Sequence, residues 1–160
     1  MRHLSIIVLA VALCSCQSEA PPSAGTPTPM VAEFHEATDM KQLMNWIMEP
    51  NADVIWDSVG TIISEEGEQN LRPETDEDWT AVRNAAATVA ESGNLLLMPG
   101  RLRDGGDWVK HAHALTRTAQ EVIAAAEAKD VDSLFTAGGD VYLVCSACHA
   151  QYAIALQKVN

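Results

Sequence analysis

Two cysteines and a histidine near the C-terminal end of the sequence have the types and the spacing that covalent haem attachment requires. Residues 145–149 read Cys-Ser-Ala-Cys-His, which fits the pattern C-x-x-C-H. Thiols at this spacing bond to two haem vinyl groups, and the next imidazole ligates the iron. In a helix the side chains of Cys145, Cys148 and His149 lie on adjoining parts of one face, so one flat ligand can meet all three. The motif predicts one covalent haem c, attached through Cys145 and Cys148, with His149 as the proximal iron ligand.

Other uses of this motif account for fewer of its residues. A structural zinc site needs four protein ligands, and the sequence has no second pair of this spacing near the motif. A thioredoxin-like dithiol is expected beside a βαβ pattern, whereas the surrounding segments have helical periodicity. A structural disulfide between the two cysteines would leave His149 without a role.

The N-terminal residues predict export. An apolar run over residues 4–13 follows Arg2 and is too short to span a bilayer, which is typical of a signal peptide. The residues before Cys16 resemble a bacterial lipobox, so we expect a lipoprotein signal peptide over 1–15, lipidation at Cys16 and a flexible tether over 16–37. The alternative is an ordinary signal peptide that releases a soluble periplasmic protein. Either reading predicts the periplasmic side of a bacterial membrane.

The charge of the chain restricts its partners. The formal net charge is -12 for 160 residues, which disfavours nucleic acid as a partner. A redox partner protein with a basic docking patch would suit this surface. Acidity that serves only solubility is the alternative.

The remaining sequence, residues 38–160, predicts one all-α domain. Apolar residues recur at helical spacing in four stretches, joined by short connections that favour an antiparallel four-helix bundle with the haem bound inside. The expected helices cover residues 38–64, with a break or kink at Pro50, and then begin at the Thr75–Asp78 capping pattern, at Asp107 and after Asp130. Gly138 and Gly139 are expected either to allow a close approach in the last helix or to belong to a loop before it.

Four helices with C-x-x-C-H in the last one resemble the class II c-type cytochromes, the cytochrome c-prime-like family. The resemblance covers residues 38–160 and implies a haem inside the bundle, with its second face lined from the first helix. Tyr152 matches an aromatic residue common in that family. Ala153 departs from the Arg or Lys that its members often carry at that place. The resemblance also allows a homodimer.

The resemblance further implies that a residue of the first helix determines whether the sixth coordination position of the haem iron is filled. Low-spin members fill it with a methionine, and high-spin members leave it open to nitric oxide or carbon monoxide. We expect Met44, in the middle of the apolar stripe, to be the distal ligand, with Met48 as the alternative. Methionines as simple core fillers remain a further alternative.

Several other side chains have weaker assignments. Arg101 and Arg103 are possible partners of the haem propionates, with exposed loop arginines as the alternative. His111 and His113 are expected to be solvated or interfacial rather than ligands. The four tryptophans are expected to build the core or shield the haem, namely Trp46, Trp56, Trp79 and Trp108.

These observations together predict a non-enzymatic electron carrier with His/Met ligation of its haem iron. The alternative is a five-coordinate haem protein that binds or senses nitric oxide or carbon monoxide. No substrate is needed for the first function, and an open iron position is needed for the second.

Overall fold

The computed structural model describes residues 33–157, and the side chains as far as residue 153. The predicted signal peptide and Cys16 lie outside this range. The described chain is mostly helical and contains one small sheet. None of its helices combines the length and the hydropathy that crossing a membrane requires.

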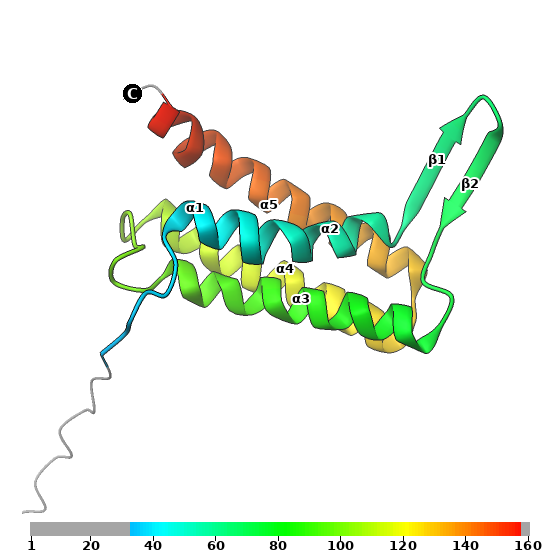
Figure 1. Ribbon diagram of the computed structural model, residues 1–160, viewed down its shortest axis with the longest axis horizontal. Helices are drawn as coiled ribbons and strands as arrows, with labels where there is room; N and C mark the ends of the chain where they lie inside the picture. The colour runs from blue at the N-terminus through cyan, green and yellow to red at the C-terminus, as the bar shows by residue number, and fades with distance from the viewer. Residues whose placement is uncertain (1–32, 158–160) are drawn as a thin grey trace, which may run out of the picture. The chain divides into compact units, whose positions relative to one another are not determined.

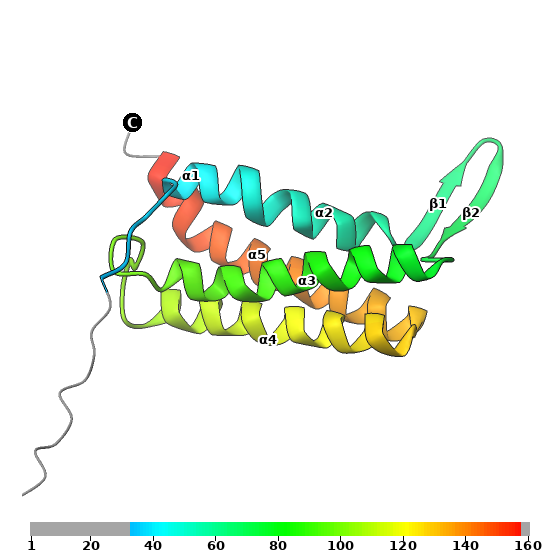
Figure 2. The ribbon, with the colours of Figure 1, turned by 60° about the horizontal axis from the view of Figure 1, so that its bottom comes forward.

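The helices lie beside one another, each roughly along the length of the domain (Figure 1). The first helical stretch is continuous and consists of α1 (Met40–Leu43), the π-helix η1 (Met44–Met48) and α2 (Glu49–Asp57). After a hairpin come α3 (Asp76–Leu96), α4 (Asp107–Ala128) and α5 (Val131–Gln157). Helices α3 and α4 lie side by side and run in opposite directions, and α5 returns along α4 (Figures 1 and 2).

The predicted helix starts are confirmed by their capping hydrogen bonds. The Asp39 carboxylate accepts from the backbone N–H of Gln42 at 2.8 Å. The Thr75 hydroxyl accepts from the N–H of Asp78 at 3.1 Å, and the Asp78 carboxylate accepts in return from the N–H of Thr75 at 2.9 Å. These reciprocal bonds satisfy backbone donors that the first turn of a helix leaves free.

Pro50 does not break the first helix, because a π-turn precedes it. A proline ring within a regular helix collides with the carbonyl group four residues earlier, here that of Trp46. In η1 the backbone N–H of Glu49 instead donates to the carbonyl oxygen of Met44, five residues back. The Asn51 side-chain amide donates to the Ile47 carbonyl oxygen at 2.6 Å. Because of this wider turn, the chain remains helical on both sides of Pro50.

The prediction that the first helix extends to residue 64 is wrong. Strands β1 (Gly60–Ser64) and β2 (Gly67–Leu71) form an antiparallel hairpin, with Ile62 opposite Gln69. Helix α2 ends at Asp57, where the backbone N–H of Ser58 donates to the Ile55 carbonyl oxygen. Gly60, with φ 147°, begins β1, and the β-branched residues that follow favour a strand. Ile62, expected on the apolar stripe, is 50 % exposed. The hairpin projects away from the helices (Figures 1 and 2).

The core forms where the periodicity predicts it in the two central helices. Trp79, Val82 and Val89 of α3 are buried against Ala112, Leu115, Ala119 and Val122 of α4. Trp108 is buried as well, whereas Trp46 is 63 % exposed and does not belong to the core.

Gly138 lies within helix α5, so its assignment to a loop is wrong. The Trp56 indole N–H donates to the Gly138 carbonyl oxygen at 3.0 Å. A Cβ atom at Gly138 would lie 3.4 Å from the Ile55 side chain. That distance is an ordinary van der Waals contact, so the space between α2 and α5 would also accept an alanine at this position.

Gly93 allows a close approach between α3 and α4. A Cβ atom there would lie 2.7 Å from the Ala112 carbonyl oxygen and would overlap the Thr116 hydroxyl. We expect Gly93→Ala to lower the free energy of unfolding by about 1–3 kcal/mol, measured by urea denaturation followed by circular dichroism. Gly139→Ala is the matched control, because open space surrounds Gly139 and alanine should raise helix stability by up to about 1 kcal/mol. Equal destabilisation by both variants would contradict this difference in packing.

Candidate functional site

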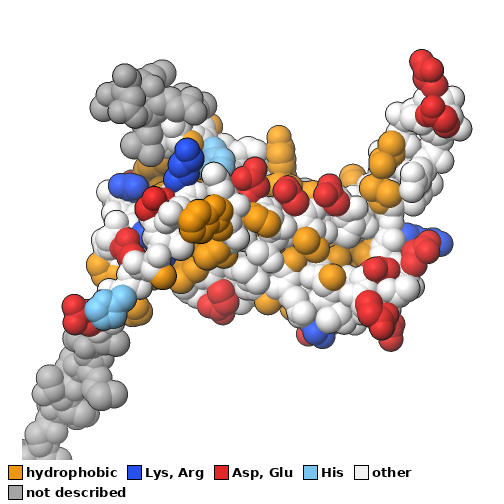
Figure 3. Space-filling view, viewed as in Figure 1, with side chains coloured by type: hydrophobic (Ala, Val, Ile, Leu, Met, Phe, Trp, Pro, Cys, Tyr) orange, Lys and Arg blue, Asp and Glu red, His pale blue; other side chains and the backbone are white. Residues whose placement is uncertain are grey.

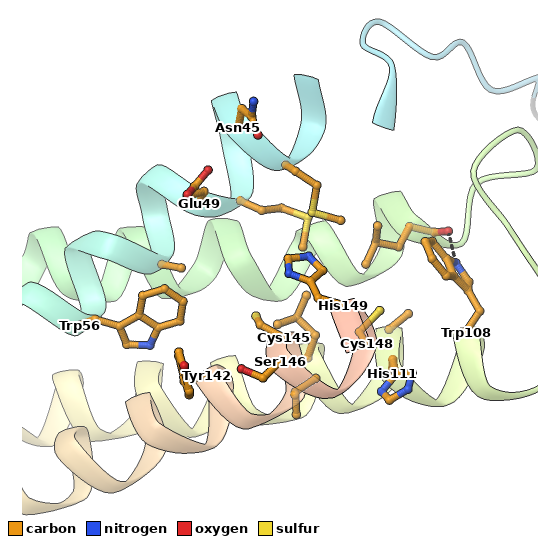
Figure 4. Close-up of a pocket in the computed structure, with 17 residues that line it drawn as sticks. Asn45, Glu49, Trp56, Trp108, His111, Tyr142, Cys145, Ser146, Cys148 and His149 are labelled. Atoms are coloured by element: carbon orange, nitrogen blue, oxygen red, sulfur yellow. Dashed lines mark hydrogen bonds between the residues drawn. The ribbon is translucent and has the colours of Figure 1, made fainter. Parts of the chain in front are cut away.

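A largely apolar cavity of about 290 Å³ lies between the first helical stretch and α5 (Figure 4). Near Gly138 the two helices are in contact, and the cavity lies on the C-terminal side of that contact along α5. Helices α3 and α4 supply its inner wall. The lining residues are Met44, Asn45, Met48, Glu49, Ala52, Trp56, Leu96, Trp108, His111, Ala112, Leu115, Tyr142, Val144, Cys145, Ser146, Cys148 and His149.

The three chemically distinctive residues of the C-x-x-C-H motif all line this cavity. Cys145 and Cys148 are half-buried and free, and His149 is exposed. The imidazole of His149 points from α5 into the space that faces the first helical stretch (Figure 4). The helical spacing of the motif thus places two thiols and an imidazole around one cavity, as the sequence predicts.

Both candidate methionines lie on the other side of the cavity. Met44 and Met48 both line it, whereas Met40 packs against the edge of the core and is not part of the lining. Met44 is half-buried and Met48 is buried in the core. A thioether sulfur can therefore approach the cavity from either residue, and Met44 is the one less committed to core packing.

Burial keeps both thiols neutral at neutral pH. It raises the pKa of Cys145 to about 11, with a smaller contribution from neighbouring Cys148, and it also raises the pKa of the Cys148 thiol. Because the thiolate is the form that attacks disulfides and oxidants, thiols in this state are slow to oxidise.

A cluster of polar and aromatic residues adjoins the cavity where α5 meets the start of α4. The Tyr152 hydroxyl donates to Asp104 at 2.5 Å, and its ring lies edge-on to Trp108 at 5.0 Å between centroids. The Trp108 indole N–H donates to the Leu96 carbonyl oxygen at 2.8 Å. Tyr152 therefore supports a lining residue, Trp108, and does not itself line the cavity.

The hydrogen bond between Tyr152 and Asp104 has a pH signature. The bond raises the pKa of Tyr152 to about 12 and lowers the pKa of Asp104. The contact therefore stabilises the folded state fully at pH values that lie above the ordinary pKa of an aspartate and below the ordinary pKa of a tyrosine. It weakens as pH rises through about 12. It also weakens as pH falls through the lowered pKa of Asp104.

We expect Tyr152→Phe to remove a tyrosine titration step near pH 12 and to move the pKa of Asp104 back towards its ordinary value. Ultraviolet titration of tyrosinate and carboxyl-carbon NMR measure the two changes. Asp104→Asn should lower the pKa of Tyr152 in turn. An unchanged tyrosine titration in Asp104→Asn would contradict the contact.

The two candidate arginines have different surroundings. The Arg101 guanidinium is buried, donates to the Thr38 carbonyl oxygen at 2.8 Å and does not line the cavity. Its Nε has no partner among the described residues. Arg103 is exposed and lies 6.0 Å from the ring centroid of Trp108. Of the pair, Arg103 is closer to a lining residue and freer to reach an anionic group.

The two histidines of α4 also differ. His111 lines the cavity, and its Nε2 lies 3.2 Å from Gln151 Oε1. His113 is exposed and is not part of the lining.

Sequence reasoning missed Tyr142, which pairs with Trp56 at the end of the cavity nearest Gly138. The Trp56 and Tyr142 rings lie edge-on, with centroids 5.7 Å apart, and both residues line the cavity. Tyr142 precedes Cys145 by three residues and His149 by seven, so helical spacing places it on the same side of α5. That spacing is the signal that could have identified it.

Comparisons with known proteins found no match to a family model, to a curated protein or to a solved structure. Within the part of the chain that the structure describes, no group of three or more His, Cys, Asp and Glu side chains is arranged to hold a metal ion.

Proposed function

We propose that this chain is a c-type cytochrome of the class II kind, a four-helix bundle that holds one covalent haem c and carries single electrons. The observation that carries the proposal is the lining of one cavity by Cys145, Cys148 and His149 on one side and by two methionines on the other. Its chemistry fits the group: thiols to bond the vinyl groups, nitrogen and sulfur donors for iron, and apolar walls. The volume of about 290 Å³ is close to the lower end of cofactor-sized sites.

In this proposal five lining residues have a defined part. Cys145 and Cys148 would hold the haem through thioether bonds, His149 would ligate its iron, and Met44, with Met48 as the alternative, would supply a second iron ligand. Haem iron, when bound, cycles between its ferric and ferrous states by taking up and releasing one electron. Thioether ligation raises the reduction potential, and the apolar walls formed by Leu96 and Leu115 exclude water.

The location and partners of the protein form part of the proposal. Export with lipidation at Cys16 would anchor the domain on the periplasmic side of a bacterial membrane, where it would exchange electrons with a basic partner protein. The role involves no catalytic turnover of a substrate. Of the two arginines, Arg103 is the one proposed to contact the haem propionates. A homodimer is compatible with this role.

The burial of Met48 favours a second candidate. If both methionines serve only as cavity walls, the iron would be five-coordinate and would bind nitric oxide or carbon monoxide. Met48, which is buried in the core, has the packing expected of a wall residue.

An absorption spectrum separates the two candidates. The protein would be matured in a periplasm able to attach haem and measured oxidised and reduced, with and without carbon monoxide. A low-spin spectrum with a thioether-to-iron band, unchanged by carbon monoxide, is expected for the electron carrier. A high-spin spectrum that shifts at once with carbon monoxide would establish the open iron position instead, and a protein without haem would contradict both.

A further inference from the structure

The outer side of α2 carries a row of acidic residues beside the cavity. Glu49, Asp53 and Asp57 are each four residues apart, so they follow one face of the helix, and all three are exposed. Glu49 also lines the cavity. Red side chains over α2 in Figure 3 lie among exposed apolar ones.

An aromatic row on α5 borders the same cavity from the other side. Phe135, Tyr142 and His149 are each seven residues apart and lie along one face of α5. Phe135 is 62 % exposed and Tyr142 is 57 % exposed, and Tyr142 and His149 line the cavity. Solvent exposure of such large aromatic side chains is typical of surfaces that another molecule covers.

The charge of this face is almost all of one sign. The first helical stretch and the described part of α5 carry Lys41 as their only Lys or Arg residue. Their acidic residues are Glu49, Asp53, Asp57, Asp132 and Asp140. None of these five forms a salt bridge with another described residue. Asp132 and Asp140 line a separate hollow between α4 and α5, so the negative potential beside the cavity comes from the three acidic residues of α2.

We propose that this rim, defined by Glu49, Asp53, Asp57, Phe135 and Tyr142, is the docking surface of the redox partner. The inference rests on the proposed function and adds where the partner binds and what its surface is. The partner is a protein with Lys and Arg side chains around an apolar centre, which complements the acidic row and covers the aromatic rings. A second copy of this chain would place one acidic row near another, which disfavours it as the occupant.

Electron transfer with small charged reagents tests the rim in the haem-loaded, full-length protein. Hexaammineruthenium(II) and the iron(II)–EDTA complex carry opposite charges, and each gives one electron to the ferric protein, which becomes ferrous. We expect Asp53→Asn with Asp57→Asn to slow reduction by the ruthenium cation about fivefold at low ionic strength and to accelerate reduction by the iron anion. Glu65→Gln with Glu66→Gln, in the hairpin turn, changes the net charge equally and should alter either rate less than about twofold. Equal effects of the two double variants would overturn the proposal.

Binding of a lysine-rich decapeptide, mapped by amide NMR shifts, provides a readout independent of electron transfer. The largest shifts are expected in α2 and α5, and both substitutions in α2 should weaken binding more than those in the hairpin. Shifts confined to the hairpin would overturn the proposal. So would a dimer in sedimentation that Tyr142→Gln dissociates, because it would assign the rim to a second copy. Haem staining of the same samples is done first. If haem is missing, the proposed function has failed, and the docking surface is then judged from the NMR shifts alone.

Discussion

Cys145→Ala combined with Cys148→Ala should abolish haem retention on denaturing gels. Only a covalent bond survives denaturation, and these are the two free thiols that line the cavity. Each single variant should retain a weaker haem stain, because one thioether bond would remain. The measurement is peroxidase staining of the denatured protein, normalised to its amount by immunoblot.

Ser146→Ala is the matched control for the cysteine variants. Ser146 lines the same cavity from the same helix but has no thiol to offer. Its haem stain should equal that of the unaltered protein. Haem staining that persists in the double cysteine variant would remove the basis of the proposed function.

Met44→Ala should convert the low-spin spectrum into a high-spin one. Without its thioether the sixth iron position would open, so the thioether-to-iron band should disappear and carbon monoxide should bind the reduced protein rapidly. The spectra with and without carbon monoxide measure this change. Met44→Leu, which keeps the bulk of the side chain, should give the same spectral result with a smaller loss of stability.

Met48→Ala is the comparison that assigns the ligand. Met48 is buried in the core, so its truncation should lower the free energy of unfolding by about 2–5 kcal/mol while the thioether band remains. Loss of the band in Met48→Ala alone would transfer the ligand role to Met48. Retention of the band in both variants would exclude the two residues as ligands.

Prediction of the fold succeeded where local signals agree with one another. In α3 the cap at Thr75 and the buried positions at Trp79, Val82 and Val89 all indicate the same helix and the same face. The hairpin was missed because Val59 and Ile62 continue a helical spacing that began in α2. The end of α2 at Asp57 and the positive φ of Gly60, the first residue of β1, leave no trace in the apolar pattern.

Prediction of the candidate site depended on how far apart its members are in sequence. The residues Cys145, Cys148 and His149 share a helix, so their spacing alone was enough to place them together. The contact between Trp56 and Tyr142 depends on how two helices cross, which the sequence pattern does not specify. The buried position of Arg101 likewise depends on the path of the loop around it, and a loop arginine gives no signal of burial.

The π-turn at Met44–Met48 takes up one residue more than a regular α-helix would hold over the same length. Leu43 before the turn and Ile55 after it are both fully buried. At about 100° per residue, a regular helix with this sequence would place the two side chains about 120° apart around its axis, and the extra residue in the π-turn removes that offset. A lineage that lost one residue from this turn would keep both side chains inside as a regular helix, but the Pro50 ring would then meet a carbonyl group four residues earlier, so the loss should be accompanied by replacement of the proline.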